Sequence, residues 1–232
     1  MKSRFLAPFL AFVLFNASAA WATNESPRDP FEPVNRAIFA FNDTLDTYAL
    51  RPLALGYRYV TPDPVERRVS DFFSNLDDLR NIVYSTAKGE FNQAGVTTAR
   101  VTFNTIFGLA GLFDVATPMG LPRKSEDLGT VLASWGVPSG PYVVLPIFGP
   151  SSVRDSLGVP SDMVLSPINY YAEADTAVGL TALDVVQTRA QFLGADQLVT
   201  GDRYLFMRDS YLQSRAFSVS QGQAENYDDS NF

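Results

Sequence analysis

Residues 135 to 150 read Trp135-Gly-Val-Pro-Ser-Gly-Pro-Tyr-Val-Val-Leu-Pro-Ile-Phe-Gly-Pro150, an apolar stretch that Gly or Pro interrupts every few residues. A helix cannot run through Pro138, Pro141 and Pro146, because each proline lacks a backbone donor and clashes with the preceding turn. A central sheet strand is also disfavoured, since proline cannot join a hydrogen-bonded ladder. The stretch is too short and too broken to span a bilayer. Irregular apolar backbone is tolerated where protein buries it or where it lines a cavity, which indicates a protein that handles apolar material.

The composition fits one exported domain with a sizeable core. The chain has 232 residues, of which 46% are hydrophobic, and a net charge of −7. Its only lysines are Lys2, Lys88 and Lys124. An acidic chain without a basic run argues against nucleic acid, whose phosphates require clustered Lys and Arg. It also argues against docking on anionic lipid by charge alone.

Cysteine and histidine are both absent from the sequence. Their absence excludes disulfides, cysteine nucleophiles, histidine general bases and metal sites built on these residues. It also excludes acyl attachment to a cysteine in this sequence. We therefore expect no cofactor and no metal.

The first 22 residues are typical of a secretory signal. Lys2 and Arg4 precede an apolar run from residue 5 to 15, and small residues follow up to Ala22, after which we expect cleavage. The alternative is a retained membrane anchor, for which the apolar run is short. We expect the mature domain to cover residues 23–217 and the acidic tail, residues 218–232, to be disordered because it has little to bury.

Helical periodicity accounts for most of the mature chain. Pro33 suits the first turn of a helix, and apolar residues from Val34 to Tyr48 recur at helical spacing, so that Pro52 either ends this helix or opens a shorter one. Further helices are predicted near 64–73, 76–87, 90–107, 126–135, 151–157, 173–193 and 195–217. Alternating strand patterns are almost absent. The sequence thus predicts an all-α single domain of amphipathic helices with an irregular apolar insert rich in Gly and Pro.

Several short motifs recur in a characteristic order. They are Asp29-Pro-Phe-Glu32, Asn35-Arg36, Phe39-Ala-Phe-Asn42, Arg51-Pro-Leu-Ala54, Tyr57, Asp71-Phe-Phe-Ser-Asn-Leu76, Arg100, Asn104-Thr105, Gly108, Gly111, Asp114-Val-Ala116, Leu128-Gly-Thr130, Trp135-Gly-Val137, Gly140-Pro-Tyr142, Leu145-Pro146, Gly149-Pro-Ser151 and Arg154-Asp155. Each motif alone is weak. As a set they resemble, over about residues 29 to 210, the MlaA/VacJ family of outer-membrane phospholipid-transport proteins.

The resemblance implies a ring-shaped helical protein in the periplasmic leaflet of the outer membrane. Its amphipathic channel would let mislocalised outer-leaflet phospholipid pass to a soluble periplasmic carrier, and a trimeric porin would be a partner. No catalysis is implied. The family's lipid-bearing cysteine is missing here, which puts the acyl anchor in doubt. Burial of about six large apolar side chains, at about 1.5–3 kcal/mol each, would match one acyl chain worth about 10 kcal/mol gross.

Apolar and glycine residues within the motifs are candidates for the lipid path. The lipid-path or membrane-facing candidates are Phe103, Ile106, Phe107, Leu109, Leu112, Phe113, Tyr142, Val143, Val144, Leu145, Ile147 and Phe148. The alternative for each of them is ordinary core. The glycines that would let backbone curve around a lumen, or that only punctuate loops, are Gly108, Gly111, Gly136, Gly140 and Gly149.

Polar residues within the motifs are candidates for lining or for control of the channel. The candidates for a polar lining are Asn35, Arg36, Arg100, Asn104, Arg154 and Asp155. An arginine can contact a lipid phosphate through its planar fork of donors, but it more often pairs with a carboxylate and orders loops. By resemblance, the helix that carries Phe41 and Asn42 controls opening. The alternative is that Phe41 packs and Asn42 faces solvent or caps a turn.

Two other classes of function are weaker alternatives. Ser85-Thr-Ala-Lys88 resembles the Ser-x-x-Lys pair of periplasmic penicillin-binding proteins and β-lactamases, but the accompanying Lys-Thr-Gly and Ser-Asp-Asn motifs are missing. Without histidine a conventional triad is impossible. The remaining alternative is a non-catalytic, porin-associated scaffold of the envelope.

Overall fold

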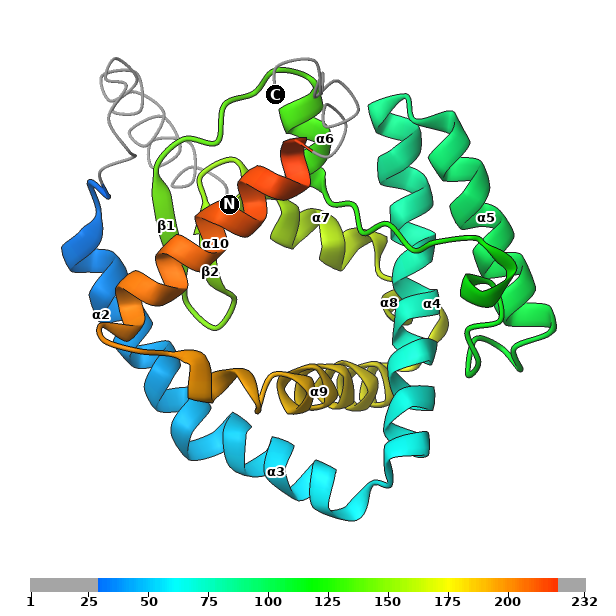
Figure 1. Cartoon of the computed structure of the whole chain (residues 1–232), viewed down its shortest axis with the longest axis horizontal. Helices are drawn as coiled ribbons and strands as arrows, with labels where there is room; N and C mark the ends of the chain where they lie inside the picture. Colours follow the sequence, from blue (N-terminus) through cyan, green and yellow to red (C-terminus); the bar gives the residue numbers. More distant parts are fainter. Residues whose placement is uncertain (1–28, 221–232) are drawn as a thin grey trace, which may run out of the picture.

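A computed structural model describes residues 29–220, whose helices follow one another around a ring (Figure 1). The predicted signal segment, 1–22, lies outside the described residues, as does the tail from residue 221 onward. The expected ring of helices is confirmed, and strand is confined to one small hairpin. The disordered tail was predicted to begin at residue 218, which is too early, because the last helix continues to Ser220.

The N-terminal arm of the ring consists of three consecutive helical segments. Helix α2 (Glu32–Leu45) begins with Pro33 in its first turn, and a π-helical turn, η1 (Asp46–Leu50), leads into α3 (Arg51–Val60). Pro52 therefore opens a shorter helix rather than ending the first one. Pro52 has no N–H to bond back along the helix. The turn before it is widened, with the N–H of Arg51 donating to the carbonyl of Asp46.

The opposite arm is an antiparallel pair of long helices. Helix α4 (Asp63–Lys88) carries Pro64 in its first turn and ends at Gly89, whose φ of 80° is the left-handed conformation that favours glycine. The two helices predicted within this range form one, since no helix-breaking residue separates them. Helix α5 (Phe91–Ile106) packs along α4 (Figure 1).

The apolar insert contains a β-hairpin, which the sequence did not predict. Strand β1 (Tyr142–Leu145) pairs antiparallel with β2 (Gly149–Ser152), with Tyr142 opposite Ser152 and Leu145 opposite Gly149. The expectation of wholly irregular backbone is wrong here, because Pro141 and Pro146 flank β1. Pro150 lies within β2, and proline is tolerated in strands that form the edge of a sheet.

Short helices connect these parts and close the ring. They are the 3-10 turn η2 (Thr117–Met119), α6 (Leu128–Ser134), the 3-10 turn η3 (Asp155–Leu157), α7 (Gly158–Leu165), α8 (Ile168–Tyr171), α9 (Ala174–Gln191), the 3-10 turn η4 (Ala195–Leu198) and α10 (Arg203–Ser220). The short helix predicted at 151–157 is instead the end of β2 and a 3-10 turn. Helix α9 packs against α3 and α4, and α10 contacts α6 and β2 (Figure 1).

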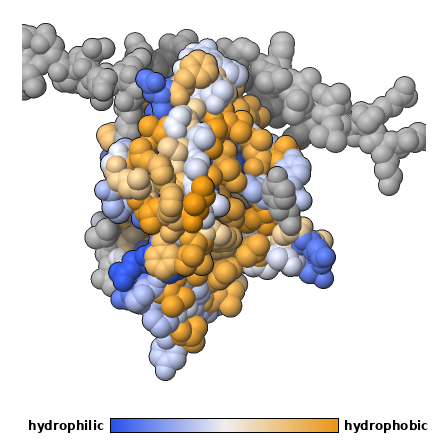
Figure 2. All heavy atoms as spheres, turned by 90° about the vertical axis from the view of Figure 1, so that its right-hand side faces the viewer, coloured by the Kyte–Doolittle hydropathy of each residue, from blue (hydrophilic) through white to orange (hydrophobic). Residues whose placement is uncertain are grey.

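Apolar side chains point outward more than inward. The main apolar cluster of buried residues consists of Tyr142, Val144 and Tyr204, and the buried set contains more polar than apolar residues. On α3 the small Ala54 is buried while Leu53 and Leu55 are exposed. Figure 2 shows apolar side chains gathered over the side of the molecule on which α5 lies. Among residues 29–220, no helix combines the length and hydropathy needed to cross a membrane.

Replacement of Gly108 by Ala tests the tight turn after α5. A Cβ there would lie 2.2 Å from the carbonyl oxygen of Phe113 and 2.4 Å from that of Asn104, both in the backbone. We expect Gly108→Ala to lower the free energy of unfolding by about 1–3 kcal/mol. The control is Gly95→Ala within α5, where no atom lies within 4 Å. That change should raise stability by about 0.5–1 kcal/mol, and equal effects of the two variants in thermal unfolding would contradict the packing.

Candidate functional site

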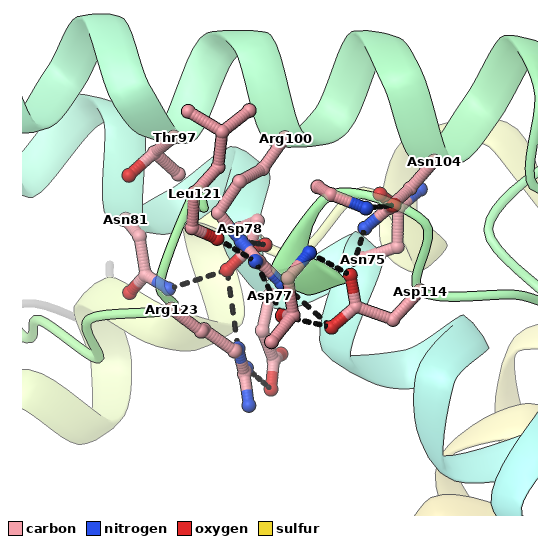
Figure 3. A network of polar contacts seen from close by, with 12 residues as sticks. Asn75, Asp77, Asp78, Asn81, Thr97, Arg100, Asn104, Asp114, Leu121 and Arg123 are labelled. Atoms are coloured by element: carbon pink, nitrogen blue, oxygen red, sulfur yellow. Dashed lines mark hydrogen bonds and ion pairs between the residues drawn. The ribbon is translucent and has the colours of Figure 1, made fainter. Parts of the chain in front are cut away.

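A buried arginine fixes the loop that follows α5. Arg100, 2% exposed, donates from Nε to Asp78 Oδ2 at 3.2 Å and from Nη2 to Asp114 Oδ2 at 3.2 Å (Figure 3). It also donates to Thr117 Oγ1 at 2.9 Å and to the carbonyl of Leu121. Because a buried charge is stable only when paired and hydrogen-bonded, these contacts hold residues 107–123 firmly against α4 and α5.

Asn104 organises the same loop from its other end. Its Oδ1 accepts from the N–H groups of Val115 at 2.9 Å and Ala116 at 3.0 Å, and its Nδ2 donates to Asp114 Oδ1 at 3.2 Å (Figure 3). Leu109 and Ala110 adopt left-handed φ angles of 52° and 58°. Such conformations cost about 1–3 kcal/mol each and persist only where the surroundings enforce them.

The loop presents an apolar surface to the outside. Ile106, Phe107 and Leu109 are each about two-thirds exposed, and Leu112 and Phe113 are also exposed. The half-buried Phe103 stacks on Phe107 with ring centroids 5.9 Å apart. We call residues 106–113 the apolar loop. The sequence candidates from α5 and its following loop thus lie together, on a rigid support.

The hairpin candidates divide between the interior and the surface. Tyr142 and Val144 are buried in the core beside Tyr204, so their side chains pack against protein. Val143 and Leu145 are half-buried, whereas Ile147 and Phe148 in the turn are exposed. The alternative of ordinary core therefore holds for Tyr142 and Val144.

Two asparagines of α2 bind the backbone of the hairpin. Asn35 donates to the carbonyl of Tyr142 at 3.1 Å and accepts from the N–H of Val144 at 2.9 Å. Asn42, two turns later, donates to the carbonyl of Leu145 at 2.9 Å and accepts from the N–H of Ile147 at 2.8 Å. Each side-chain amide thus occupies the position of a neighbouring strand's backbone, and α2 covers the open edge of β1.

Phe41 and Asn42, the two residues predicted to control opening, differ in their surroundings. Phe41 is 55% exposed, so it does not pack in the interior, and Asn42 binds the hairpin turn rather than solvent. Ile147, which Asn42 holds, has a left-handed φ of 72°. Phe41 therefore does not pack, whereas the alternative that Asn42 caps a turn agrees with its two bonds to the hairpin turn.

Most of the predicted polar lining is buried and bound to protein. Asn35, Arg100, Asn104 and Arg154 are each less than 9% exposed, and Asp155 is nearly as enclosed. Their role here is to order loops and helices. Arg36 differs, because its half-exposed guanidinium lies 4.4 Å from the ring of Tyr204 and pairs with Glu32 and Asp202. The predicted glycines serve backbone geometry: Gly111, Gly136, Gly140 and Gly149 have positive φ, and Gly108 lies in tight contact.

A second charged cluster joins α10 to α6. Arg215 pairs with Asp127, the N-cap of α6, and with Asp155, which also accepts from Arg154 Nε at 2.8 Å and the Tyr211 hydroxyl at 2.6 Å. Burial by itself would raise the pKa of Asp155. The hydrogen bonds from Arg154, Tyr211 and Arg215 outweigh burial and lower that pKa to about 2.

A third cluster, which sequence reasoning missed, lies where η1 meets the C-terminal part of the chain. Arg189 binds Asp46 through two bonds of 2.7 and 3.0 Å and Asp196 through contacts of 3.0 and 2.9 Å. These hydrogen bonds raise the pKa of Arg189. The cluster borders a cavity of about 290 Å³ whose remaining lining residues are Thr47, Arg51, Val199 and Arg203. Asp46 and Arg189 are 143 positions apart, so no local spacing could have connected them.

The enzymatic alternative finds no support in the arrangement of Ser85 and Lys88. Ser85 is 0% exposed, and Lys88 Nζ is bound to Glu90 at 2.9 Å and Glu126 at 2.8 Å. A serine without access to substrate cannot act as a nucleophile, and the amine of Lys88 is bound by two carboxylates rather than by the serine. Residues 29–220 contain no group of acidic side chains arranged to hold a metal ion.

Comparison with known proteins identifies the family. The family model described as MlaA lipoprotein matches residues 27–218. The chain belongs to the MlaA lipoprotein family. Members of this family include the intermembrane phospholipid transport system lipoprotein MlaA of Shigella flexneri, which is 33% identical over 238 residues, covering 100% of this chain and 94% of that protein.

Other relatives of the MlaA family agree with this assignment. An uncharacterized protein of Rickettsia felis is 37% identical over 195 residues, which cover 82% of this chain and 78% of that protein. A solved structure, described as the structural basis for maintenance of bacterial outer membrane lipid asymmetry, superimposes with a TM-score of 0.71 at 34% identity. That match covers 82% of this chain and 98% of the solved chain.

The lowered pKa of Asp155 predicts a specific pH dependence of stability. Relative to an ordinary aspartate pKa of about 3.9, a folded-state pKa near 2 stabilises the protein by about 2 kcal/mol at neutral pH. This contribution is complete above about pH 4 and is lost as the pH falls through the folded pKa. Asp155→Asn should therefore be destabilised by about 2 kcal/mol at pH 7, and the difference from the parent should disappear only below the folded pKa of about 2.

Chemical unfolding at several pH values measures this difference. The control is Asp209→Asn, which removes a half-exposed carboxylate whose one ion pair within residues 29–220 is with the adjacent Arg208, so its effect should stay below about 1 kcal/mol. A loss in Asp155→Asn that is constant with pH would contradict the assigned electrostatic origin.

Proposed function

We propose that this protein is the outer-membrane component of an intermembrane phospholipid transport system. It removes mislocalised phospholipid from the outer leaflet and passes it to a soluble periplasmic carrier, which maintains lipid asymmetry. The observation that carries this proposal is the match over the whole chain to a phospholipid transport lipoprotein. The family is one of transport components, and no catalytic step is needed.

The distribution of apolar side chains supports a place in the membrane interface. The exposed residues of α3 and of the apolar loop would be costly in water, since contiguous apolar surface is normally covered. The ring would lie within one leaflet, where amphipathic helices bury their apolar faces at the membrane interface. With no cysteine in the sequence to carry an acyl chain, burial of this surface in lipid would hold the protein in the periplasmic leaflet. A trimeric porin would be its membrane partner.

The contact between Asn42 and the hairpin supports a role for α2 in opening the channel. Within residues 29–220, Asn42 is the one residue of α2 that hydrogen-bonds to the turn that carries the exposed Ile147 and Phe148, and it makes two such bonds. Loss of this contact would free the turn while Asn35 still bound the base of the hairpin. We propose that Asn42 keeps the hairpin turn in the closed position of the lipid path.

The proposed function predicts a lipid phenotype. A strain without this protein should accumulate phospholipid in the outer leaflet, as measured by labelling or by an outer-leaflet lipase, and the native chain should reverse it. The physical reason is that mislocalised phospholipid would have no path back through the membrane. No accumulation, in a strain without a second copy, would refute transport and favour a porin-associated scaffold.

The proposed role of Asn42 predicts a separate phenotype. Asn42→Ala removes both bonds to the hairpin turn, whose contribution is about 0.5–1.5 kcal/mol each, and should misplace lipid at a normal protein level. Thr44→Ala is the control, because the Thr44 hydroxyl is exposed and bonds only within α2 to Ala40. If both variants gave the same amount of outer-leaflet phospholipid, Asn42 would not control the lipid path. The same conclusion would follow if Asn42→Ala merely reduced the protein level.

A further inference from the structure

We infer that the cavity between η1, the end of α9 and the start of α10 binds a phosphate group, as carried by a phospholipid headgroup or free in solution. The cavity is lined by three arginines, two aspartates, Thr47 and Val199, with a volume of about 290 Å³. For the phospholipid source, the inference rests on the proposed function. The choice of phosphate as the bound group, and of the residues that bind it, rests on the cavity alone.

The first step is that two arginines have donors to spare. Arg51 approaches Asp196 only loosely, with Nε 3.5 Å from Oδ2, and Arg203 Nη1 lies 2.8 Å from Asp43 Oδ1. Both side chains are 50% exposed. A guanidinium carries five N–H donors, and within residues 29–220 these two have no further ion pair. Most of their donors therefore remain available to a ligand in the cavity.

The second step is that the carboxylates of the cavity are already neutralised. Arg189, 14% exposed, binds both Asp46 and Asp196 through its planar fork. The lining arginines Arg51, Arg189 and Arg203 carry +3, and the two lining aspartates together with Asp43, the partner of Arg203, carry −3, so the cavity is locally neutral in a chain whose net charge is −7. A neutral site with spare guanidinium donors would accept an anion more readily than the acidic surface at large.

The third step concerns the chemistry that two guanidinium groups prefer. Arginine forks match the tetrahedral oxygens of phosphate, which accept two parallel N–H bonds from each fork. The exposed Thr47 adds a hydroxyl donor at the same cavity. Thr47 and Asp46 belong to the π-helical turn, a widened turn that is frequent at functional sites.

Size and surroundings favour the headgroup end of a lipid. The volume is at the lower limit of small-molecule sites, about 300–1,000 Å³, which suits a headgroup and leaves no room for two acyl chains. Leu45 and Tyr48, next to lining residues in the sequence, and Phe192, three residues after Arg189, are exposed apolar side chains. Acyl chains of a lipid bound by its phosphate would find apolar contacts there.

Binding to purified full-length protein in detergent tests the inference. The probes are inorganic phosphate, and a short-chain phosphatidylethanolamine and phosphatidylglycerol below their micellar concentrations, measured by calorimetry. Arg51→Gln and Arg203→Gln should each weaken binding about tenfold or more, because each removes charge-assisted hydrogen bonds to phosphate. Their present surface pairs contribute at most about 1 kcal/mol, so both variants should fold with unchanged melting temperatures.

The control is Arg58→Gln, which removes the same charge from the exposed side of α3, outside the cavity. Binding of short-chain lipid that phosphate displaces, and that only the two cavity variants weaken, would support a headgroup site. Binding of phosphate without lipid would support the phosphate site and refute its lipid source. Equal binding by the parent and the Arg51→Gln, Arg203→Gln double variant would overturn the inference.

The same variants separate this inference from the proposed function. If the native chain restores lipid asymmetry in a deletion strain and the double variant restores it equally, transport stands and a headgroup role of the cavity is refuted. If the deletion strain has normal asymmetry, transport fails, while binding of phosphate in the purified protein still decides the chemistry of the cavity.

Discussion

An arginine that bridges two aspartates is the interaction on which the ring depends, and at three joints within residues 29–220 it connects three different parts of the chain. In each case the two aspartates come from different parts of the chain, so one guanidinium fixes three elements together. The joints are Arg100 with Asp78 and Asp114, Arg189 with Asp46 and Asp196, and Arg215 with Asp127 and Asp155. The first holds the apolar loop, the second joins η1 to η4, and the third joins α10 to α6.

Charged joints suit a protein whose apolar side chains face outward. A ring of thin walls has little interior, and its buried positions here are more often polar than apolar. Apolar residues on the outside cannot hold the helices to one another, whereas an ion pair with both partners satisfied can do so in a small volume. The asparagine contacts of α2 with the hairpin follow the same principle, since they replace apolar packing by hydrogen bonds to backbone groups that would otherwise be unpaired.

Local features of the fold were predictable from the sequence, and long-range ones were not. Prolines and glycines marked the starts and ends of helices correctly, as Pro33 and Gly89 show, because these residues act on their own backbone. The prolines of this stretch argue against a strand, but Pro141 and Pro146 flank β1 and leave its four residues free to pair. For the site, the exposure of the apolar loop agreed with its composition. The partners of Asn35, Arg100 and Arg189 lie far away in the sequence, and periodicity carries no information about such contacts.

The outward-facing apolar surface has a thermodynamic consequence. The heat capacity of unfolding grows with the apolar area that unfolding newly exposes to water, typically about 12–15 cal/mol/K per residue. In this ring much of that area is exposed in the folded chain already, as the side chains of α3 and the apolar loop show. Its heat capacity change should be small for its length, which flattens the dependence of stability on temperature. The frame would then hold its shape over a wide range of temperature, whereas a lipid bilayer stiffens on cooling and loosens on warming.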